Sequence, residues 1–412
     1  FTQSGAGGSF VGTAYTFFTS ALKDHTLWSW GYNAAGALAQ NNASPVNYSS
    51  PVQIGSDANW IDIHNSGAHN SEVAAIKDDG TLWMWGSNWK GGLGQNSSGG
   101  DWPAWANSVS SPIQVGSDTT WGEGTTSLGN KTHLSTGYHT VGCIKTDGTL
   151  WMWGNNAGGD LAQNDVASRS SPVQVGSETT WKQIAVMYYG AAAIKTDGTL
   201  WVWGDNGRGA LGQNQPDNAK CSSPVQIPGT TWKVVDTISG KGCAAIKTDG
   251  TLWSWGYNYQ GALGNNLAAS DANVEVNNYS SPIQIPGTTW ANIDGSGSNY
   301  GGLATKTDGT LWGWGNNDNG RLGQNNRTQY SSPVQIPGTD WPTTDRKKLS
   351  GGSMNSSAAI KTDGTFWVWG HNNYGQLGKN NVVRYSSPVQ VPGTNYITIS
   401  GSNNRMIALR ES

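Results

Sequence analysis

The sequence has little charge, few cysteines and no long apolar run. Only 12% of its 412 residues are Asp, Glu, Lys or Arg, and the formal net charge is −3. No block of Lys or Arg forms the basic surface that nucleic-acid binders use, so we expect no nucleic-acid partner. No stretch approaches the roughly 18 apolar residues of a membrane span, so we expect no membrane insertion. Three cysteines are too few for a disulfide framework.

Patterns that carry catalytic or metal chemistry are also scarce. The six histidines are scattered without metal-ligand spacing, and only His64 and His69 share one segment. Most repeats place an Asp before a Gly, where turn formation accounts for it. An enzyme acting on polysaccharide would need two acids together outside such turns, and the sequence places none. We therefore expect no catalytic residue, no cofactor, no metal and no enzyme activity.

Glycine and tryptophan, in contrast, are abundant: the chain has 58 Gly and 23 Trp. Many of the tryptophans belong to a repeated motif, Leu-Trp-x-Trp-Gly, whose last copy begins with Phe366. The seven copies have their first tryptophans at positions 28, 83, 151, 201, 253, 312 and 367. The spacing of 50 to 68 residues is in the range of a propeller blade.

Each motif belongs to a longer unit that predicts four strands. Using one unit as the example, a first strand covers Trp232–Thr237 and a second ends at Lys247. Asp249-Gly250 predicts a two-residue type I′ hairpin turn into a third strand at Thr251–Gly256. The fourth strand, by analogy with Pro224–Ile227, lies at an outer edge, where proline is tolerated. The sequence therefore predicts an all-β protein, a seven-bladed propeller of four-stranded antiparallel blades in one domain over residues 1–412.

The motif tryptophans are expected to form the core between blades. In each third strand both tryptophans point to one face and the residue between them to the other. Since each Trp can bury about 150–250 Å², we expect all fourteen to stabilise blade stacking. Cys143 and Cys243 precede the second-strand Ile-Lys pairs and are expected in the core, whereas Cys221 is expected in a variable loop as a free thiol.

The repeat resembles that of the regulator of chromosome condensation family. The resemblance rests on Ala-Ile-Lys, a turn, and Trp-Gly-x-Asn-x-x-Gly-x-Leu-Gly, and it extends from about Leu22 to Glu411. It implies a seven-bladed propeller, but the family includes exchange factors, a light receptor, enzyme inhibitors and many other proteins, so function does not follow from it. Few repeats carry the family's His before the second strand, and the light-sensing segments are absent, which argues against nucleotide exchange and photoreception.

The chain ends depart from the repeat. Segments 396–400 and 406–411 resemble a first and a second strand without a third. We expect residues 395–412 to join the blade that contains Trp28 and to close the ring. Residues 16–23, within an N-terminal segment (1–22) of uncertain role, compete for the same second-strand place, and the sequence leaves this choice open.

Binding is expected on one face of the disc. The loops between first and second strands and between third and fourth strands vary, while the opposite face repeats short turns. Exposed aromatic residues in and near these loops are candidate anchors. The candidate binding residues are Trp89, Trp102, Trp105, Tyr259, Tyr330, Tyr374 and Tyr385. The alternative is that these aromatics only pack their own loops.

The function favoured by the sequence is non-enzymatic binding or assembly. We expect a surface-exposed or virion structural or attachment protein, located outside the cell or on a virus particle, that binds a protein or glycan within a larger assembly. The alternative is a secreted proteinaceous enzyme inhibitor or a lectin-like binder. A nucleotide-exchange factor is a weaker expectation.

Overall fold

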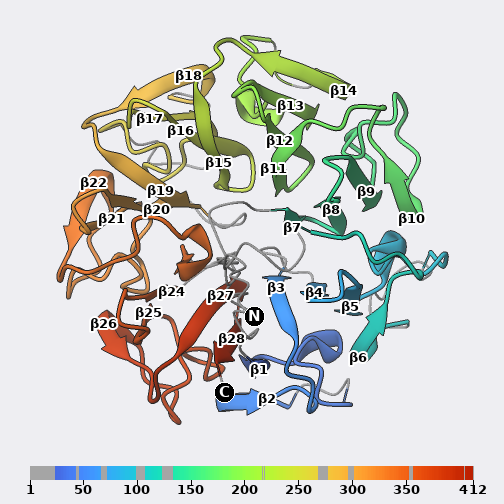
Figure 1. Cartoon of the computed structure of the whole chain (residues 1–412). Helices are drawn as coiled ribbons and strands as arrows, with labels where there is room; N and C mark the ends of the chain where they lie inside the picture. The colour runs from blue at the N-terminus through green and yellow to red at the C-terminus, as the bar shows by residue number, and fades with distance from the viewer. Residues whose placement is uncertain are drawn as a thin grey trace, which may run out of the picture.

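The computed structural model arranges seven sheets around a central axis (Figure 1). Every sheet has four antiparallel strands, and the regular helices are single 3₁₀ turns. The predicted seven-bladed, all-β fold is therefore confirmed. The structure describes residues 24–42, 46–65, 72–98, 107–122, 133–215, 217, 219–267, 277–295, 301–351, 356–402 and 404–411.

The blades are numbered in ring order. Blade 1 contains β27 (Tyr396–Ser402), β28 (Arg405–Glu411), β1 (His25–Gly31) and β2 (Tyr48–Gln53). Blade 2 contains β3 (Trp60–Asn65), β4 (Val73–Lys77), β5 (Leu82–Gly86) and β6 (Val109–Gln114), and blade 3 contains β7 (Leu134–Thr136), β8 (Thr140–Ile144), β9 (Leu150–Gly154) and β10 (Arg169–Gln174). Blade 4 contains β11 (Trp181–Met187), β12 (Gly190–Lys195), β13 (Leu200–Asp205) and β14 (Lys220–Ile227).

The remaining blades follow the same order from the axis outward. Blade 5 contains β15 (Trp232–Ile238), β16 (Gly242–Lys247), β17 (Leu252–Gly256) and β18 (Tyr279–Ile285). Blade 6 contains β19 (Trp290–Asp294), β20 (Gly301–Lys306), β21 (Leu311–Gly315) and β22 (Tyr330–Ile336), and blade 7 contains β23 (Leu349–Ser350), β24 (Ser356–Ile360), β25 (Phe366–Gly370) and β26 (Tyr385–Gln390). The 3₁₀ turns are η1 (Ala34–Gly36), η2 (Trp89–Gly91), η3 (Gly207–Gly209) and η4 (Arg346–Lys348).

The two ends of the described chain meet in blade 1. Strand β28 pairs with β1 from His25 opposite Glu411 to Gly31 opposite Arg405, and β27 pairs with the other edge of β28. The second-strand place of this blade is thus filled by β28. The competing N-terminal segment, residues 16–23, lies outside the described residues.

The turn between the second and third strands differs from the predicted type I′ hairpin. In blade 5 the N–H of Gly250 donates to the carbonyl of Lys247, and Gly250, but not Asp249, has a positive φ, of 79°. The loop therefore has three residues, a turn closed by a left-handed glycine. The Asp249 carboxylate accepts hydrogen bonds from the N–H and the hydroxyl of Thr251, at 3.0 and 2.7 Å, which explains why Asp stays out of the left-handed region.

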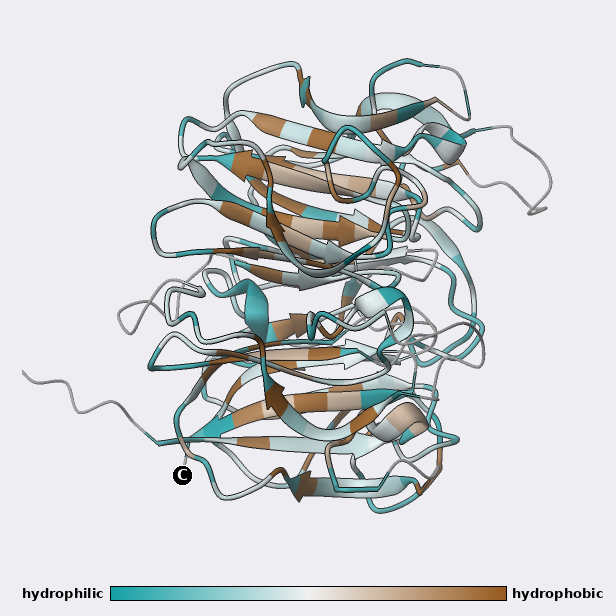
Figure 2. Cartoon of the chain, turned by 90° about the vertical axis from the view of Figure 1, so that its right-hand side faces the viewer, coloured by the Kyte–Doolittle hydropathy of each residue, from teal (hydrophilic) through white to brown (hydrophobic). Residues whose placement is uncertain are grey.

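The two tryptophans of each motif have different environments. The second one, such as Trp203, is fully buried between blades, whereas the first, such as Trp201, is half-buried. The expectation that all fourteen form the core is thus right for seven, and the others lie nearer the turn face. Figure 2 shows how apolar residues concentrate along the strands inside the disc.

Lysines explain the half-buried tryptophans. In blades 2 to 7 a Lys at the end of the second strand, or directly after it, places its ammonium over two Trp rings; Lys247 Nζ lies 4.7 Å from the ring centre of Trp232 and 4.3 Å from that of Trp253. Such cation–π contacts attract the ammonium to the ring faces. In blade 1, Arg410 lies over Trp28 and Tyr396 in the same way.

Every junction between blades repeats the same bonds. The indole N–H of the buried Trp donates to a loop carbonyl of the preceding blade, as from Trp203 to Asp160 at 2.8 Å. A backbone N–H in each third-to-fourth loop donates to the outer strand of the next blade, as from Asn164 to Ser222 at 2.8 Å. Each apolar core cluster likewise mixes residues of two neighbouring blades; Cys143 and Cys243 belong to two of them.

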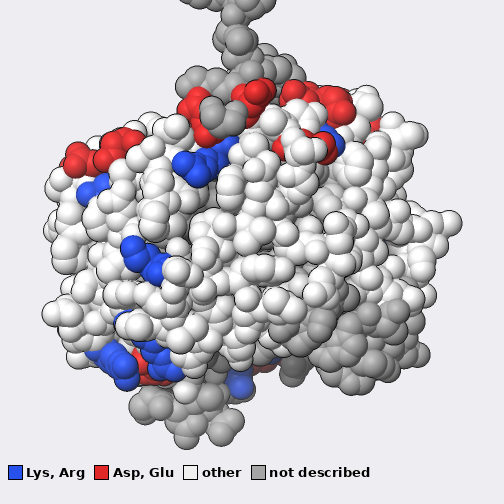
Figure 3. All heavy atoms as spheres, turned by 90° about the horizontal axis from the view of Figure 1, so that it is seen from below, with Lys and Arg blue, Asp and Glu red and all other residues white. Residues whose placement is uncertain are grey.

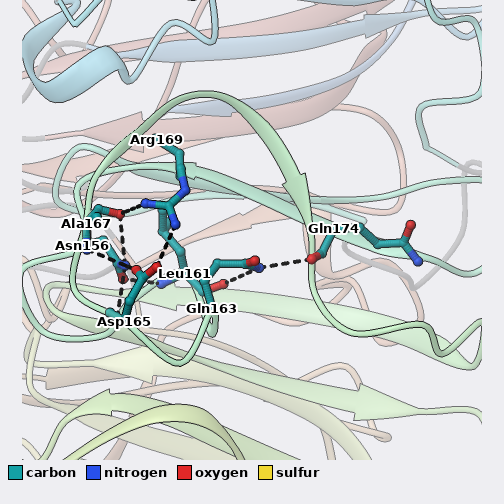
Figure 4. A network of polar contacts seen from close by, with 7 residues as sticks. All are labelled: Asn156, Leu161, Gln163, Asp165, Ala167, Arg169 and Gln174. Atoms are coloured by element: carbon teal, nitrogen blue, oxygen red, sulfur yellow. Dashed lines mark hydrogen bonds and ion pairs between the residues drawn. The ribbon is translucent and has the colours of Figure 1, made fainter.

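One asparagine anchors each third-to-fourth loop. In blade 3 the Asn156 amide donates to the carbonyls of Asp165 and Ala167, and its Oδ1 accepts from the N–H of Leu161 at 2.8 Å (Figure 4). Gln163 bridges the carbonyls of Leu161 and Gln174. The same Asn-to-Leu bond occurs in all seven blades. The repeated Asn-x-x-Gly-x-Leu motif therefore fixes the base of each loop and leaves its tip to vary.

Candidate binding site at the mouth of the central channel

We call the side of the disc with the second-to-third turns the turn face, and the opposite side the loop face. On the side of the disc seen in Figure 3, acidic side chains gather at the upper rim, which is the turn face, and most basic ones lie below it. The exposed turn residues Asp57 and Asp79 belong to this face.

The first strands of the blades line the central channel and join in a ring of hydrogen bonds. In most blades a polar side chain near the end of the first strand accepts a hydrogen bond from a backbone N–H of the next blade's first strand, at the position one residue further along that strand. Six of the seven junctions carry this bond, and the acceptors are Ser400, His64, Ser135, Asp236, Asp294 and Ser350. Donor–acceptor distances run from 2.7 Å, between Gly351 and Asp294, to 3.2 Å, between Gly295 and Asp236.

The seventh junction, between blades 4 and 5, is different. Ala185 stands where the other strands have the acceptor, so no such bond can form there. Gln183, two residues earlier, takes over by accepting from the Val235 N–H at 3.2 Å and donating to the Val235 carbonyl at 2.9 Å. Between blades 4 and 5 the ring of hydrogen bonds is therefore completed by the Gln183 side chain, which lies two residues earlier in its strand than the acceptors of the other junctions.

An insertion in blade 7 reaches into the channel. The turn η4 precedes β23, and its Arg346 and Lys347 contact carboxylates of blades that are not neighbours of blade 7. Arg346 Nη2 lies 2.7 Å from Asp236 of blade 5, and Lys347 Nζ lies 2.9 Å from Asp62 of blade 2. Arg346 also donates to the Val235 carbonyl at 2.8 Å. The Asp345 carboxylate accepts from the Lys347 N–H and caps the turn.

Burial sets the protonation of the titratable groups in the channel. Burial, followed by the charges of Arg346 and Lys347, lowers the pKa of His64 to about 3, so its imidazole is neutral at pH 7. The His64 Nδ1 accepts from the Thr136 N–H at 3.1 Å. Burial raises the pKa of Asp236, and the guanidinium of Arg346 opposes that rise.

A pocket of about 70 Å³ remains in the channel beside η4. Because one water needs roughly 10–15 Å³ of such space, the pocket has room for several waters or one extended side chain. Apolar residues of the first strands, including Ile63, Val186 and Ile399, line it together with Arg346 and Lys347. Tyr138 and Tyr188, from the first-to-second loops of blades 3 and 4, place the pocket's mouth on the loop face.

The loop face carries four aromatic rings at this mouth, which we call the aromatic cluster: Trp89, Tyr138, Tyr188 and Tyr189. Tyr138 and Tyr188 are stacked with ring centres 4.1 Å apart, and Tyr189 meets both edge-on. Trp89 of blade 2 contacts Tyr138 at 6.2 Å. All four are half-buried. The cluster therefore joins three blades and leaves part of each ring open to a partner.

A buried polar pair supports the cluster from below. His139 packs edge-on against Trp89, with ring centres 4.4 Å apart, and its Nδ1 bonds to the buried carboxylate of Glu72 in blade 2. His139 has a φ of 57°, which is uncommon for a residue with a side chain. The contact with Glu72 thus ties the loop that presents Tyr138 to blade 2.

Two further predicted residues lie in small aromatic groups elsewhere on this face. Tyr259 is parallel to Tyr257, with ring centres 5.9 Å apart, and Arg208 lies over Tyr257. Tyr374 contacts Tyr32 at 4.9 Å, joining blades 7 and 1. The structure thus brings Trp89 into the aromatic cluster but places Tyr259 and Tyr374 apart from it.

The remaining predicted residues do not join the site. Tyr330 and Tyr385 begin the outer strands β22 and β26, and their hydroxyls accept bonds from Asn326 and Asn381 of their own loops. This matches the alternative in which an aromatic residue packs its own loop. Trp102 and Trp105 lie outside the described residues, as does His69. Cys221, expected in a loop, is half-buried in β14 because that strand begins at Lys220; its thiol is free.

Sequence reasoning missed Tyr138, Tyr188, Tyr189 and the whole channel ring. A signal for the ring existed: a polar residue follows four positions after the first-strand Trp or Tyr in Trp60-Ile-Asp-Ile-His64, Trp232–Asp236, Trp290–Asp294 and Tyr396–Ser400. A signal for the cluster existed in Tyr188-Tyr189, directly before the Gly that opens a second strand. In the part of the chain that the structure describes, no group of three His, Cys, Asp or Glu residues could hold a metal ion. No helix found there is long and apolar enough to span a membrane.

Comparison with known proteins agrees with the geometry. The sequence model of the Regulator of chromosome condensation (RCC1) repeat matches residues 147–194, 197–246, 308–345 and 363–407, and a second model of the same repeat matches residues 347–376. RCC1-type repeats are therefore found along these segments of the chain. The fold of Prp20p from Saccharomyces cerevisiae superposes with a TM-score of 0.77 over 95% of this chain and 92% of that one, at 17% identity, and human WBSCR16 does so with a TM-score of 0.72 over 94% and 99%, at 18% identity.

The curated relatives are larger proteins or match in part. The mitochondrial RCC1 domain-containing protein RUG3 of Arabidopsis thaliana is 27% identical over 37% of this chain, and human Protein RCC2 is 31% identical over 38%. The human E3 ubiquitin-protein ligase HERC2 is 26% identical over 76% of the chain. The matched segments span 34%, 29% and 6% of the lengths of these relatives, so their activities do not transfer with the repeat.

Proposed function

We propose that this RCC1-type propeller is a protein-binding module whose partner docks on the loop face, over the aromatic cluster. The observation that carries the proposal is the contact of four half-buried rings, drawn from three blades, around the mouth of the channel pocket. Tyrosine and tryptophan anchors of this kind dominate protein interfaces because they bury large apolar areas with little loss of side-chain entropy. No catalytic role is assigned to any residue of the site.

The solved structures suggest the kind of partner. By their titles, Prp20p was tested for binding to Gsp1p and histones, and yeast RCC1 was crystallised with bound Kap60. Gsp1p, histones and Kap60 are partners named for those yeast proteins, and for this chain they are the first candidates to test. A glycan partner, an inhibitor function and an extracellular or virion location remain predictions, because neither RUG3, RCC2 nor HERC2 is described as a glycan binder, an inhibitor or a virion protein.

Comparative capture tests this function. The full chain and the double variant Tyr138→Ala/Tyr189→Ala would be immobilised separately and exposed to extract of the source organism, and bound proteins quantified by mass spectrometry. We expect a defined set of proteins on the unmodified chain that falls at least tenfold on the double variant. The matched control is Tyr330→Ala, which removes a tyrosine of the outer rim and should retain the set.

Two results would contradict the proposal. Equal capture by the unmodified chain and the cluster variant would move the partner away from this site. Loss of capture with Tyr330→Ala as well would indicate general unfolding or a rim site. Thermal melting of all three proteins separates these cases, because the cluster residues are half-buried and their loss should leave the disc folded.

A further inference from the structure

One loop of the loop face buries a carboxyl group that has few hydrogen-bond donors. In the repeated Asn-x-x-Gly-x-Leu motif the residue before Leu is Ala, Gly, Arg or Gln in six blades, and only blade 3 has an acid there, Asp160. Asp160 is fully buried, and its Oδ1 forms no hydrogen bond with a described residue. Its Oδ2 accepts two long bonds, from the Gly158 N–H at 3.3 Å and the Asn155 amide at 3.4 Å. Since buried polar atoms in proteins are nearly always bonded, this carboxyl group needs a physical explanation.

A second carboxylate, that of Asp205 in blade 4, lies beside Asp160, and we call the two the carboxyl pair. Gly158 leaves a gap between them: a Cβ atom at this position would lie 2.7 Å from Asp160 Oδ1, 3.3 Å from the Cβ of Asp205 and 3.2 Å from the Cβ of Tyr189. Asp205 is half-buried, and its Oδ1 accepts from the Gly207 N–H at 2.7 Å. The unbonded oxygen of Asp160 therefore faces a gap that it shares with Asp205 and Tyr189.

The charges around this gap favour a proton on Asp160. Burial, and to a smaller extent the charge of Asp205, raises the pKa of Asp160 to about 7, against the opposing effects of the Gly158 N–H and the charge of Lys220. Lys220 donates to a loop carbonyl at 3.1 Å, and neither Lys220 nor Lys241, which lies near the Asp205 carboxylate, forms an ion pair with a described residue. Two carboxyl groups that share a site do not readily ionise together, so one of them keeps a proton.

The carboxyl pair is connected to the aromatic cluster through the backbone. The Asp205 N–H donates to the carbonyl of Tyr189 at 2.8 Å, and the Tyr189 ring meets Tyr138 and Tyr188 edge-on. A displacement of Asp205 is therefore passed directly to Tyr189, and from Tyr189 to the other tyrosines of the cluster.

From these contacts we propose that the carboxyl pair regulates docking at the aromatic cluster by gaining or losing one shared proton. With the proton present, Asp160 Oδ1–H donates to the Asp205 carboxylate and ties blade 3 to the residue that holds Tyr189. When the proton leaves to water, two like charges face each other, this bond is lost and Tyr189 is displaced. Docking should thus weaken as the pH rises through neutrality. The effect on docking rests on the proposed function, whereas the titration of the pair requires no partner.

NMR of the tyrosine rings tests the titration in the free full chain. The tyrosines would be isotope-labelled, the signal of Tyr189 assigned with Tyr189→Phe, and spectra recorded from about pH 5.5 to about pH 8.5, on both sides of the expected midpoint. We expect the Tyr189 signal to shift with a midpoint near pH 7, whereas the signal of Tyr330 in the outer strand β22 stays constant. A Tyr189 signal that does not change over this range would overturn the proposal.

Three variants assign the titration to the carboxyl pair. Asp160→Asn removes the titrating group while its amide can still donate to Asp205, so the transition at Tyr189 should disappear. Asp165→Asn changes an exposed carboxylate of the same loop, paired with Arg169, and should leave the transition in place. Lys220→Met removes a positive charge that favours the ionised form and should raise the midpoint. An unchanged transition in Asp160→Asn would assign it to another group and refute the proposal.

Capture from extract at two pH values tests the effect on docking. The unmodified chain and Asp160→Asn would each be exposed to extract at about pH 6 and about pH 8, below and above the expected midpoint. We expect the protein set of the unmodified chain to fall at least threefold at the higher pH, and that of Asp160→Asn to stay equal. Equal capture by the unmodified chain at both pH values would refute the regulation. If Tyr189 titrates but no protein is captured at either pH, the docking proposal fails and the shared proton stands.

Discussion

The turn face and the loop face are built from the same repeat but tolerate variation very differently. On the turn face, blades 2 to 7 each form the same three-residue turn, and all seven blades place a basic side chain over two rings, so few residues are free to vary. On the loop face one Asn and usually one Gln hold the base of each loop, and the tip follows no common pattern. The difference indicates that a loop can vary in sequence when polar side chains hold its base and leave its tip unconstrained.

The largest expected loss of stability comes from replacing one of the tryptophans that are fully buried between blades. Trp203→Ala should destabilise the protein by about 3–5 kcal/mol, because it empties a core site and leaves the Asp160 carbonyl without its indole donor. Trp201→Ala, at the half-buried position two residues earlier, should cost clearly less. The midpoint of denaturant unfolding of both variants checks the ranking, and equal losses would remove the distinction between the two positions.

The anchor of a single loop gives the next effect. Asn156→Ala should cost about 2–3 kcal/mol, since the N–H of Leu161 and the carbonyls of Asp165 and Ala167 lose their buried partner. Gln163→Ala, which breaks two bonds at a more exposed place, should cost about 1 kcal/mol. Calorimetry of the two variants measures the order. A larger loss with Gln163→Ala than with Asn156→Ala would show that the asparagine is not the main anchor of the loop base.

An individual feature of the loop face predicts a pH dependence. Burial raises the pKa of Asp160 to about 7, so the folded state holds this proton more tightly than the unfolded chain. Near pH 3 the Asp160 carboxyl is protonated in both the folded and the unfolded state, so it does not lower the free energy of unfolding. As the pH rises from about 4 to 7, the unfolded chain loses this proton first, and the folded state becomes progressively less stable. Asp160→Asn should therefore raise the melting temperature at pH 8, by the equivalent of about 2–4 kcal/mol, and leave it unchanged near pH 3. A gain of equal size at both pH values would show that the charge is not the cause.

The smallest expected effect on stability distinguishes two lysines of the turn face, Lys195 in blade 4 and Lys247 in blade 5. Lys195 is paired with Glu178 at 2.5 Å and also lies over Trp181 and Trp201, whereas Lys247 lies over its two rings and forms no ion pair with another described residue. Lys195→Met should cost a few tenths of a kcal/mol more than Lys247→Met, because an ion pair with one solvent-exposed partner, here Glu178, contributes about that much. The excess should shrink in 1 M NaCl. An excess that is insensitive to salt would assign it to packing.

Much of the fold could be predicted from the sequence because the same strand and turn pattern occurs seven times. The spacing of the Trp pairs predicted the blades, and the first and second strands at 396–400 and 406–411 lie in the blade of Trp28. The turn type was wrong because Asp-Gly alone does not reveal that Thr251 would engage the Asp249 carboxylate. The burial of the first tryptophans was overestimated because the alternation of a strand says nothing of a lysine lying over the ring.

The site was less predictable because it is assembled from positions that lie far apart in the chain. Trp89 was singled out as an aromatic residue outside the repeat, but its neighbours Tyr138 and Tyr188 come from two other blades, and nothing in the sequence indicates that the three lie together. The reach of Arg346 across the channel to Asp236, two blades earlier in the chain, depends on how an insertion folds inward. Sequence periodicity locates the blades, whereas contacts across the axis depend on ring closure.

The pairing of β1 with β28 has a consequence for biosynthesis. Blade 1 contains the first two described strands, β1 and β2, and the last two, β27 and β28. During translation β1 and β2 therefore emerge before β28, the strand that pairs with the inner edge of β1. The pairing of β1 with β28 closes a loop of several hundred residues. The entropy lost in closing this loop is offset only when the junctions between blades have formed, so such non-local pairing is slow. Until residues 405–411 leave the ribosome, the nascent chain carries an open strand edge, the kind of surface that chaperones protect and that neighbouring nascent chains can invade.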